Sequence, residues 1–149
     1  MCQRWGRDER GSSLVEMALV SLFLIMLLAG AIDFGWAFHD FIILQNASRE
    51  GARVAARLPC KNDDLVQRTY LRGLIVAAAQ GEVAQSGIES SDITVTVTPD
   101  PVSSTCPAAG APFTVAVRYN YDTTLGGILG LGAIPMQAQT RMAFFGNDQ

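Results

Sequence analysis

Hydrophobic residues form one long run near the start of the chain. From Leu14 to Ile32 the only charged residue is Glu16. A helix needs about 20 apolar residues, at 1.5 Å per residue, to cross the hydrocarbon layer of a membrane. The run therefore predicts a transmembrane helix, which we assign to residues 12–33.

The helical pattern continues beyond this run, and no proline occurs before Pro59. Apolar and small residues recur at helical spacing on one side, namely Ala37, Phe41, Leu44, Ala47, Gly51, Val54, Ala55 and Leu58. Polar residues gather on the opposite side, although Asp40 falls within the apolar stripe. Residues 34–58 are thus expected to continue the same helix outside the membrane, with the apolar side packed on other elements.

The chain changes character after Pro59. Asp63 or Asp64 can cap a second helix from Leu65 to about Gln80, and residues 81–91 are expected to be a connection. Strict alternation of apolar and polar residues then predicts three strands, at residues 93–98, 113–121 and 134–144. A small antiparallel sheet with one apolar face needs a helix to cover it. Residues 59–149 are therefore predicted to form a small α+β domain, covered by the outer half of the long helix.

The connection between the last two predicted strands, residues 125–135, has the sequence LGGILGLGAIP. Its glycines invite comparison with a phosphate-binding loop, but the spacing and lysine of that loop are absent and no helical pattern follows. We expect an apolar loop. Two interpretations stay open: the loop packs under the sheet, or it contacts lipid or an adjacent subunit.

The charge distribution predicts an orientation. The 149-residue chain has a net charge of −3, and three arginines precede the apolar run. Arginines flanking a transmembrane helix favour the cytoplasmic side, so everything after Ile32 is expected on the far side. Without residues 1–11 the chain has eight basic and twelve acidic side chains. This acidic balance argues against a nucleic-acid partner.

The three cysteines fall on different sides of the predicted membrane. Cys2 precedes the helix, whereas Cys60 and Cys106 follow it, in a compartment that permits oxidation. We expect a Cys60–Cys106 disulfide. The rival interpretation is a metal pair, but the cysteines lack CxxC spacing and His39 is the only histidine. No metal or cofactor is expected, and no nucleophile with a neighbouring base is recognisable, so the chain is not expected to be an enzyme.

Glu16 and Gly11 together carry a more specific signal. A carboxylate at the centre of a membrane helix costs roughly 2.5–3.5 kcal/mol and usually has a partner. The order here is a basic leader, Gly11, four residues, Glu16 and then the apolar run. This order resembles the start of type IV prepilins and pseudopilins. The resemblance implies that a prepilin peptidase removes the leader, residues 1–11, and that Glu16 pairs with the Ser12 amine of a neighbouring subunit.

Two simpler interpretations of the apolar run stay open. It can be a plain signal anchor, or a secretory signal cleaved after Ala31, because Ala29-Gly30-Ala31 offers small residues to signal peptidase. The hydrophobic region of a signal peptide is typically about 7–15 residues long, and this run is longer. The run also contains Glu16, for which a signal peptide has no use.

A second resemblance follows the transmembrane helix. Residues 45–53, QNASREGAR, are similar to the segment found in the TadE-like family of pseudopilins from the tight-adherence (Tad/Flp) pilus system. Its small residues would let another backbone approach closely. The possible helix interaction segment comprises Arg49, Glu50, Gly51 and Arg53. The alternative is a solvated helix end whose charges neutralise one another.

The resemblance implies a pilin-like fold and a minor pilin in the inner membrane, with a cytoplasmic N-terminus and a periplasmic or extracellular domain. Implied partners are the prepilin peptidase, other pilin and pseudopilin subunits, the inner-membrane assembly platform and the lipid bilayer. A TadF or short TadG-like role belongs to the same class. From another class, an anchored periplasmic binding or sensor module that never polymerises is the main alternative.

Overall fold

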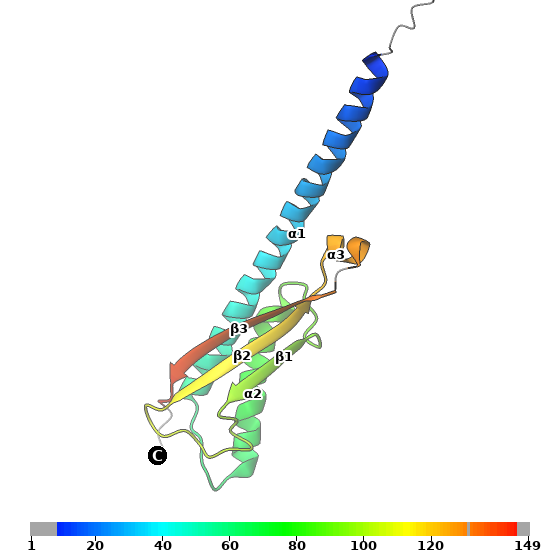
Figure 1. Ribbon diagram of the computed structural model, residues 1–149. Coiled ribbons are helices and arrows are strands. Elements are labelled where there is room, and N and C mark those ends of the chain that lie inside the picture. The colour runs from blue at the N-terminus through cyan, green and yellow to red at the C-terminus, as the bar shows by residue number, and fades with distance from the viewer. Residues whose placement is uncertain (1–8, 131, 146–149) are drawn as a thin grey trace, which may run out of the picture.

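The computed structural model describes residues 9–130 and 132–145, so most of the predicted leader lies outside the described part. Its elements in chain order are α1 (Glu9–Arg57), α2 (Leu65–Ala84), β1 (Ile93–Thr98), β2 (Pro112–Tyr121), α3 (Thr124–Leu129) and β3 (Ile134–Ala143). Figure 1 shows a long helical rod whose outer half carries a small domain. The predicted α+β architecture, with a long N-terminal helix, a second helix and a three-stranded antiparallel sheet, is confirmed.

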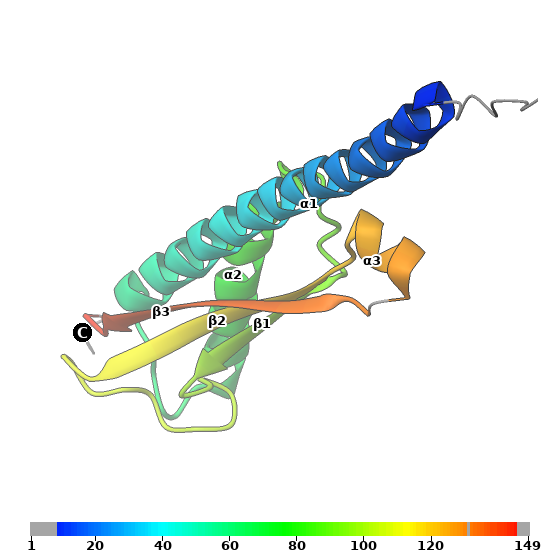
Figure 2. The same cartoon turned by 45° about the horizontal axis from the view of Figure 1, so that its top comes forward.

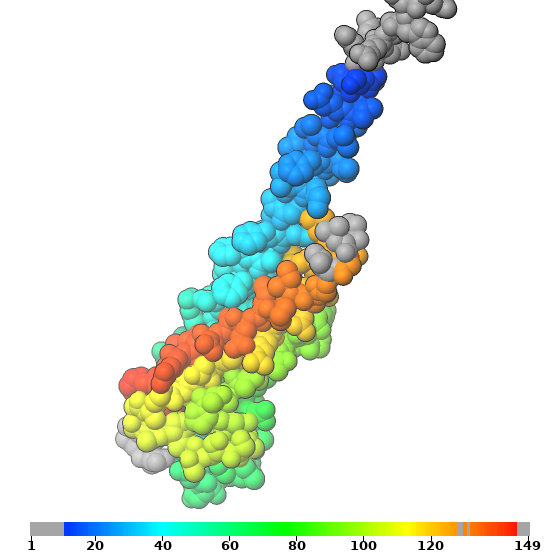
Figure 3. Space-filling view, in the orientation of Figure 1, coloured from blue at the N-terminus to red at the C-terminus, as the bar shows by residue number. Residues whose placement is uncertain are grey.

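The first half of α1 projects alone from the domain. Its large apolar side chains are exposed on every side, as Phe23 at 62% and Phe34 at 73% illustrate. The space-filling view shows this blue stalk extending beyond the rest of the chain (Figure 3). In the described part of the chain, α1 is the one helix long and apolar enough to cross a membrane. Its 49 residues span about 73 Å at 1.5 Å per residue.

The second half of α1 packs with α2 against one face of the sheet, as both ribbon views show (Figures 1 and 2). The strand order is β1-β2-β3, all antiparallel. The central strand places Val115 and Val117 toward the helices, and both are fully buried. Alternation along β2 thus produces the apolar face that the sequence predicted.

Small residues bring α1 close to its neighbours. Ala47 and Ala52 are fully buried. A methyl group placed on Gly51 would lie 3.2 Å from Val115 Cγ1 and 3.3 Å from the Ile75 carbonyl oxygen. The backbones of α1, α2 and β2 therefore converge at Gly51, where a larger side chain does not fit without displacement.

The second helix begins as expected and ends later. The Asp64 side chain is the N-cap and accepts a hydrogen bond from the Gln67 N–H at 2.9 Å. The helix continues to Ala84 rather than ending near Gln80, so the predicted connection is shorter by one turn. Burial of Val83 against the core explains the extension, because packing outweighs the low helix propensity of Gly81.

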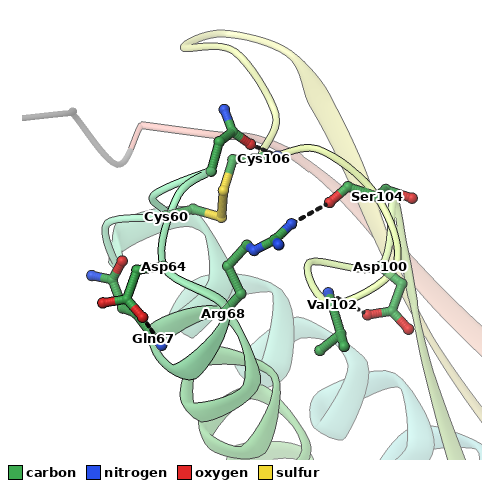
Figure 4. Close-up of a disulfide and its surroundings, with 9 residues drawn as sticks. Cys60, Asp64, Gln67, Arg68, Asp100, Val102, Ser104 and Cys106 are labelled. Carbon is green, nitrogen blue, oxygen red and sulfur yellow. Dashed lines mark hydrogen bonds between the residues drawn. A yellow bond between two sulfur atoms is a disulfide. The ribbon is translucent and has the colours of Figure 1, made fainter.

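A disulfide joins the segment between α1 and α2 to the proline-rich loop between β1 and β2 (Figure 4). Cys60 and Cys106 are bonded, with their Cα atoms 5.7 Å apart. The Arg68 guanidinium donates to the Ser104 carbonyl at 3.0 Å, and the Cys106 N–H donates to Asn62 Oδ1 at 2.6 Å. Closing a loop of this length stabilises a fold by about 4 kcal/mol in the chain-entropy model.

The expectation of a loop between β2 and β3 was wrong in part, because residues 124–129 form the short helix α3. The Thr123 hydroxyl caps it by accepting from the Gly126 N–H at 2.8 Å. Gly130 ends it with a φ of 71°, a left-handed conformation that glycine adopts at no steric cost. These local caps stabilise a turn of helix that the periodicity of the sequence does not indicate.

The close approach at Gly51 predicts a large penalty for a bulky residue. Gly51→Leu should lower the free energy of unfolding by about 1–3 kcal/mol, since overpacking displaces Val115 and the α2 backbone. Gly73→Leu in α2 is the matched control, because a methyl group there meets nothing within 4 Å. Both changes gain the same helix propensity. The difference between the melting temperatures of the two variants, measured in detergent, therefore reports the cost of overpacking at Gly51. Equal melting temperatures would contradict the packing at Gly51.

Candidate functional site

The predicted processing positions lie at the free end of α1. Gly11 and Ser12 are exposed and helical, and a methyl group on Gly11 would meet nothing within 4 Å. Glu16 is also exposed. Residues four apart share one face of a helix, so Glu16 lies on the same side as Ser12, one turn further along. The backbone after Gly11 and the Glu16 carboxylate are therefore both open to another molecule.

On the side away from Ser12 and Ser13, the surroundings of Glu16 are apolar. The neighbouring Leu14 and Met17 are 70% and 71% exposed. The one polar side chain between Glu16 and Ile32, Ser21, donates its hydroxyl hydrogen to the Ala18 carbonyl at 2.9 Å and is thereby satisfied. In a membrane, a partner for the Glu16 charge must come from the chain's own terminus or from a second molecule.

Asp33 marks the other end of the apolar run and was not assigned a role from the sequence. Its carboxylate accepts hydrogen bonds from the Leu125 N–H at 2.7 Å and the Thr124 N–H at 3.2 Å. The Tyr121 hydroxyl donates to the Asp33 carbonyl oxygen at 3.4 Å. Asp33 is 8% exposed. It thus connects α1 to the first turn of α3, two segments about 90 residues apart in the sequence.

Asp40 lies two turns further along α1 and is partly buried. Burial raises the pKa of its carboxyl, and the neighbouring His39 offsets part of that increase. The pKa of the Tyr119 phenol is raised by burial and, to a smaller extent, by the charge of Asp40. Asp40 falls in the apolar stripe, as the sequence indicated, and ionises less readily for that reason. Among the described residues, no group of three His, Cys, Asp or Glu side chains could hold a metal ion.

The helix interaction segment divides between two faces of α1. The Arg53 guanidinium pairs with Glu50 at 2.5 Å, and Arg49 donates to Gln45 Oε1 at 3.1 Å. Arg49 and Arg53 are exposed, whereas Gly51 faces α2 and β2 of the same chain. The small residues of the segment therefore serve the packing of this chain, and its charged residues face outward.

A polar contact fixes α1 to the edge strand β3. Ser48 is fully buried, and its hydroxyl lies 2.8 Å from the Thr140 hydroxyl. The Ser48 hydroxyl also lies 2.9 Å from the Gln45 carbonyl, to which it donates, so Thr140 is the donor in the bond between the two hydroxyls. Sequence analysis did not identify Ser48, although it lies directly beside the apolar stripe at Ala47.

Comparison with protein families finds one match. The family model described as TadE-like protein matches residues 11–53. The match confirms the predicted resemblance. It begins at Gly11 and ends at Arg53, so it includes Ser12, Glu16, the apolar half of α1 and the helix interaction segment. It leaves out the domain that follows. Comparison with curated proteins and with solved structures finds no match.

The family match suggests a protein associated with the Tad pilus and similar to minor pilins. The match also suggests interaction with other pilin subunits, and the family is structural rather than enzymatic. The long apolar N-terminal helix suggests a single-pass membrane anchor. The family match and the anchor coincide in the sequence, since both lie in α1.

The contact of Asp33 with α3 can be tested by substitution. Asp33→Ala leaves the Thr124 and Leu125 N–H groups without their acceptor, at a cost of about 1–3 kcal/mol in local stability. Amide hydrogen exchange at both positions should accelerate, while exchange in β2 stays slow. The exposed Asp122 provides the control, Asp122→Ala. Unchanged protection of Leu125 in the Asp33 variant would disprove the role of this carboxylate.

Proposed function

We propose that this chain is a pseudopilin, or minor pilin, of a Tad/Flp-type pilus that supports adhesion to surfaces. It is made as a precursor, inserted into the inner membrane through residues 12–33 and cut after Gly11 by a prepilin peptidase. Residues 34–58 continue the helix into the periplasm, and residues 59–149 form the periplasmic domain. Its role is to assemble or prime the pilus together with other pilin subunits and the inner-membrane assembly platform.

The proposal rests on one observation. The large side chains in the apolar half of α1 are exposed, and Gly11, Ser12 and Glu16 lie together, also exposed, at its N-terminal end. Apart from Leu125 near Gly30, no described residue of the chain covers this surface, which must be covered by lipid before assembly. Neighbouring helices can replace lipid in a fibre. The Glu16 carboxylate then requires a cationic partner. Cleavage after Gly11 creates such a partner, because it frees a positively charged amine on Ser12.

The orientation follows from charge and redox chemistry. The arginines of the leader favour the cytoplasm. The Cys60–Cys106 disulfide lies at the opposite end of the molecule and requires an oxidising compartment. Both features support an inner-membrane protein with a cytoplasmic N-terminus and a periplasmic domain.

The size of the domain supports a minor role. The major pilins of this pilus type, by resemblance, are little more than a helix, whereas this chain carries a sheet, a second helix and a disulfide. Arg49 and Arg53 are on the exposed face of α1, where acidic groups of another subunit can reach them. A folded domain of this size is better suited to recognising other subunits than to being the subunit that repeats along the fibre.

The mature N-terminus tests the processing step. Mass spectrometry of the protein purified from cells that contain the prepilin peptidase should find Ser12 as the first residue. A catalytically inactive peptidase is the control and should leave residues 1–11 in place. A mature chain that begins at Ile32 would identify a secreted domain, and an intact N-terminus in the presence of active peptidase would identify a plain anchor. Either result overturns the proposal.

Substitution of Glu16 tests the pairing step. Glu16→Ala should abolish pilus assembly while the protein still inserts and is still cut, because the carboxylate is needed only between subunits. Ser21→Ala, which removes another polar group from the same helix, should leave assembly intact. Pili can be counted by electron microscopy and insertion measured by membrane fractionation. An anchored sensor module that never polymerises predicts no effect of either change on its own activity.

A further inference from the structure

An uncharged segment connects β2 to β3 at the end of the sheet nearest the bare half of α1. We define the apolar connection as residues 124–130 and 132–134, which contain no charged side chain. It comprises α3 and the residues leading into β3. Ile134 is 47% exposed, and Gly127, Gly132 and Ala133 are exposed as well. The connection therefore presents apolar atoms and backbone to its surroundings, whereas the exposed Asp92 and Asp122 lie beside it at this end of the sheet.

The apolar connection lies level with the last turn of the apolar run of α1. A methyl group on Gly30 would lie 3.9 Å from Leu125 Cδ1, and the Asp33 carboxylate binds the Leu125 N–H. Both ribbon views place α3 beside α1, closer to its bare half than the rest of the sheet (Figures 1 and 2). A span of about 20 residues from Leu14 ends at Asp33. The connection is therefore at the depth where that span leaves the hydrocarbon.

An open apolar groove runs between α1 and the apolar connection. Its volume is about 350 Å³, and its lining includes Phe34, Ala37, Leu125 and Ile134. Phe34 is 73% exposed and Trp36, two residues on, is 61% exposed. Aromatic side chains at the end of a transmembrane helix are typical of the boundary between hydrocarbon and headgroups.

The polar groups that join the connection to α1 and begin α3 are satisfied within the chain. Both Asp33 carboxylate oxygens accept backbone hydrogen bonds from α3, and the Gly126 N–H is bound by Thr123. Bringing an unpaired charge into the boundary region would be costly. This arrangement avoids that cost at Asp33, whose carboxylate is buried and doubly bonded. The exposed Asp122 lies two residues before the connection.

We infer that the apolar connection rests in the outer boundary of the bilayer, so that the domain contacts lipid at a second place besides α1. The inference depends on the membrane anchoring in the proposed function. The occupant is lipid because the patch is continuous with the bare surface of α1 at a single depth, and one bilayer covers both. Two lipid contacts on one rigid unit fix the tilt of the domain, with the disulfide end pointing away from the membrane.

Depth-dependent fluorescence quenching tests the inference. The full chain, with Cys2→Ser and its disulfide intact, is labelled with an environment-sensitive fluorophore at Ala133→Cys and reconstituted as one copy per lipid nanodisc. A phosphatidylcholine carrying a spin label just below its headgroup quenches from the membrane, and iodide quenches from water. The matched control is Ala109→Cys, an exposed alanine in the loop that holds Cys106.

The inference predicts that the spin-labelled lipid removes most of the emission at position 133 and that iodide removes little. Position 109 should show the reverse. Iodide quenching at position 133 as strong as at position 109 overturns the inference. So does a probe at position 133 that neither quencher reaches, because then protein rather than lipid covers the patch. Adding Ile134→Asp should expose the probe to iodide without releasing the protein from the nanodisc.

These outcomes are separate from those of the proposed function. A mature chain that begins at Ile32 lacks the anchor, and then the processing proposal fails. A chain that begins at Ser12, assembles pili and still shows a water-exposed position 133 leaves the proposed function intact and removes only the second lipid contact.

Discussion

Close packing of the small face of α1 against α2 and β2 is the contact on which the rest of the structure depends. At Gly51 the neighbouring side chain and backbone would lie within 3.3 Å of an added methyl group. Leu44, Ala47 and Ala52 extend the same fully buried face along the helix. Without this approach the sheet would lose the cover of its apolar face, and the domain would have no fixed relation to the helix that carries it.

A single helix thereby has two halves with different surfaces. Its first half carries large apolar residues on every side, and its second half carries small residues on one side and charges on the other. The change occurs near Asp33, where a carboxylate is directed inward to the backbone of α3 instead of outward to water. The family match follows the helix rather than the domain, since it ends at Arg53. The matched segment therefore covers the passage of one helix from an exposed apolar surface to a folded domain.

Much of this architecture was predictable from the sequence, because it follows from periodicity. The run from Leu14 to Ile32, the alternating strands and the cap at Asp64 are local signals, and the structure contains each of them. The contacts of Asp33 with Thr124 and of Ser48 with Thr140 join residues about 90 positions apart. No local pattern encodes such pairs. The extra turn of α2 likewise depends on the burial of Val83 in a core that forms only after folding. The roles of Gly11, Ser12 and Glu16 depend on other molecules and lie beyond a single chain.

The continuity of α1 has a mechanical consequence. Its helical hydrogen bonding is unbroken from Glu9 to Arg57, without a proline or a non-helical residue, and the Asp33 contact braces it where it meets the domain. Sharp kinks in helices occur mostly at prolines and π-bulges, and α1 has neither, so it should curve gently rather than bend at a hinge. A displacement of its N-terminal half is then passed on to the domain instead of being absorbed at a kink.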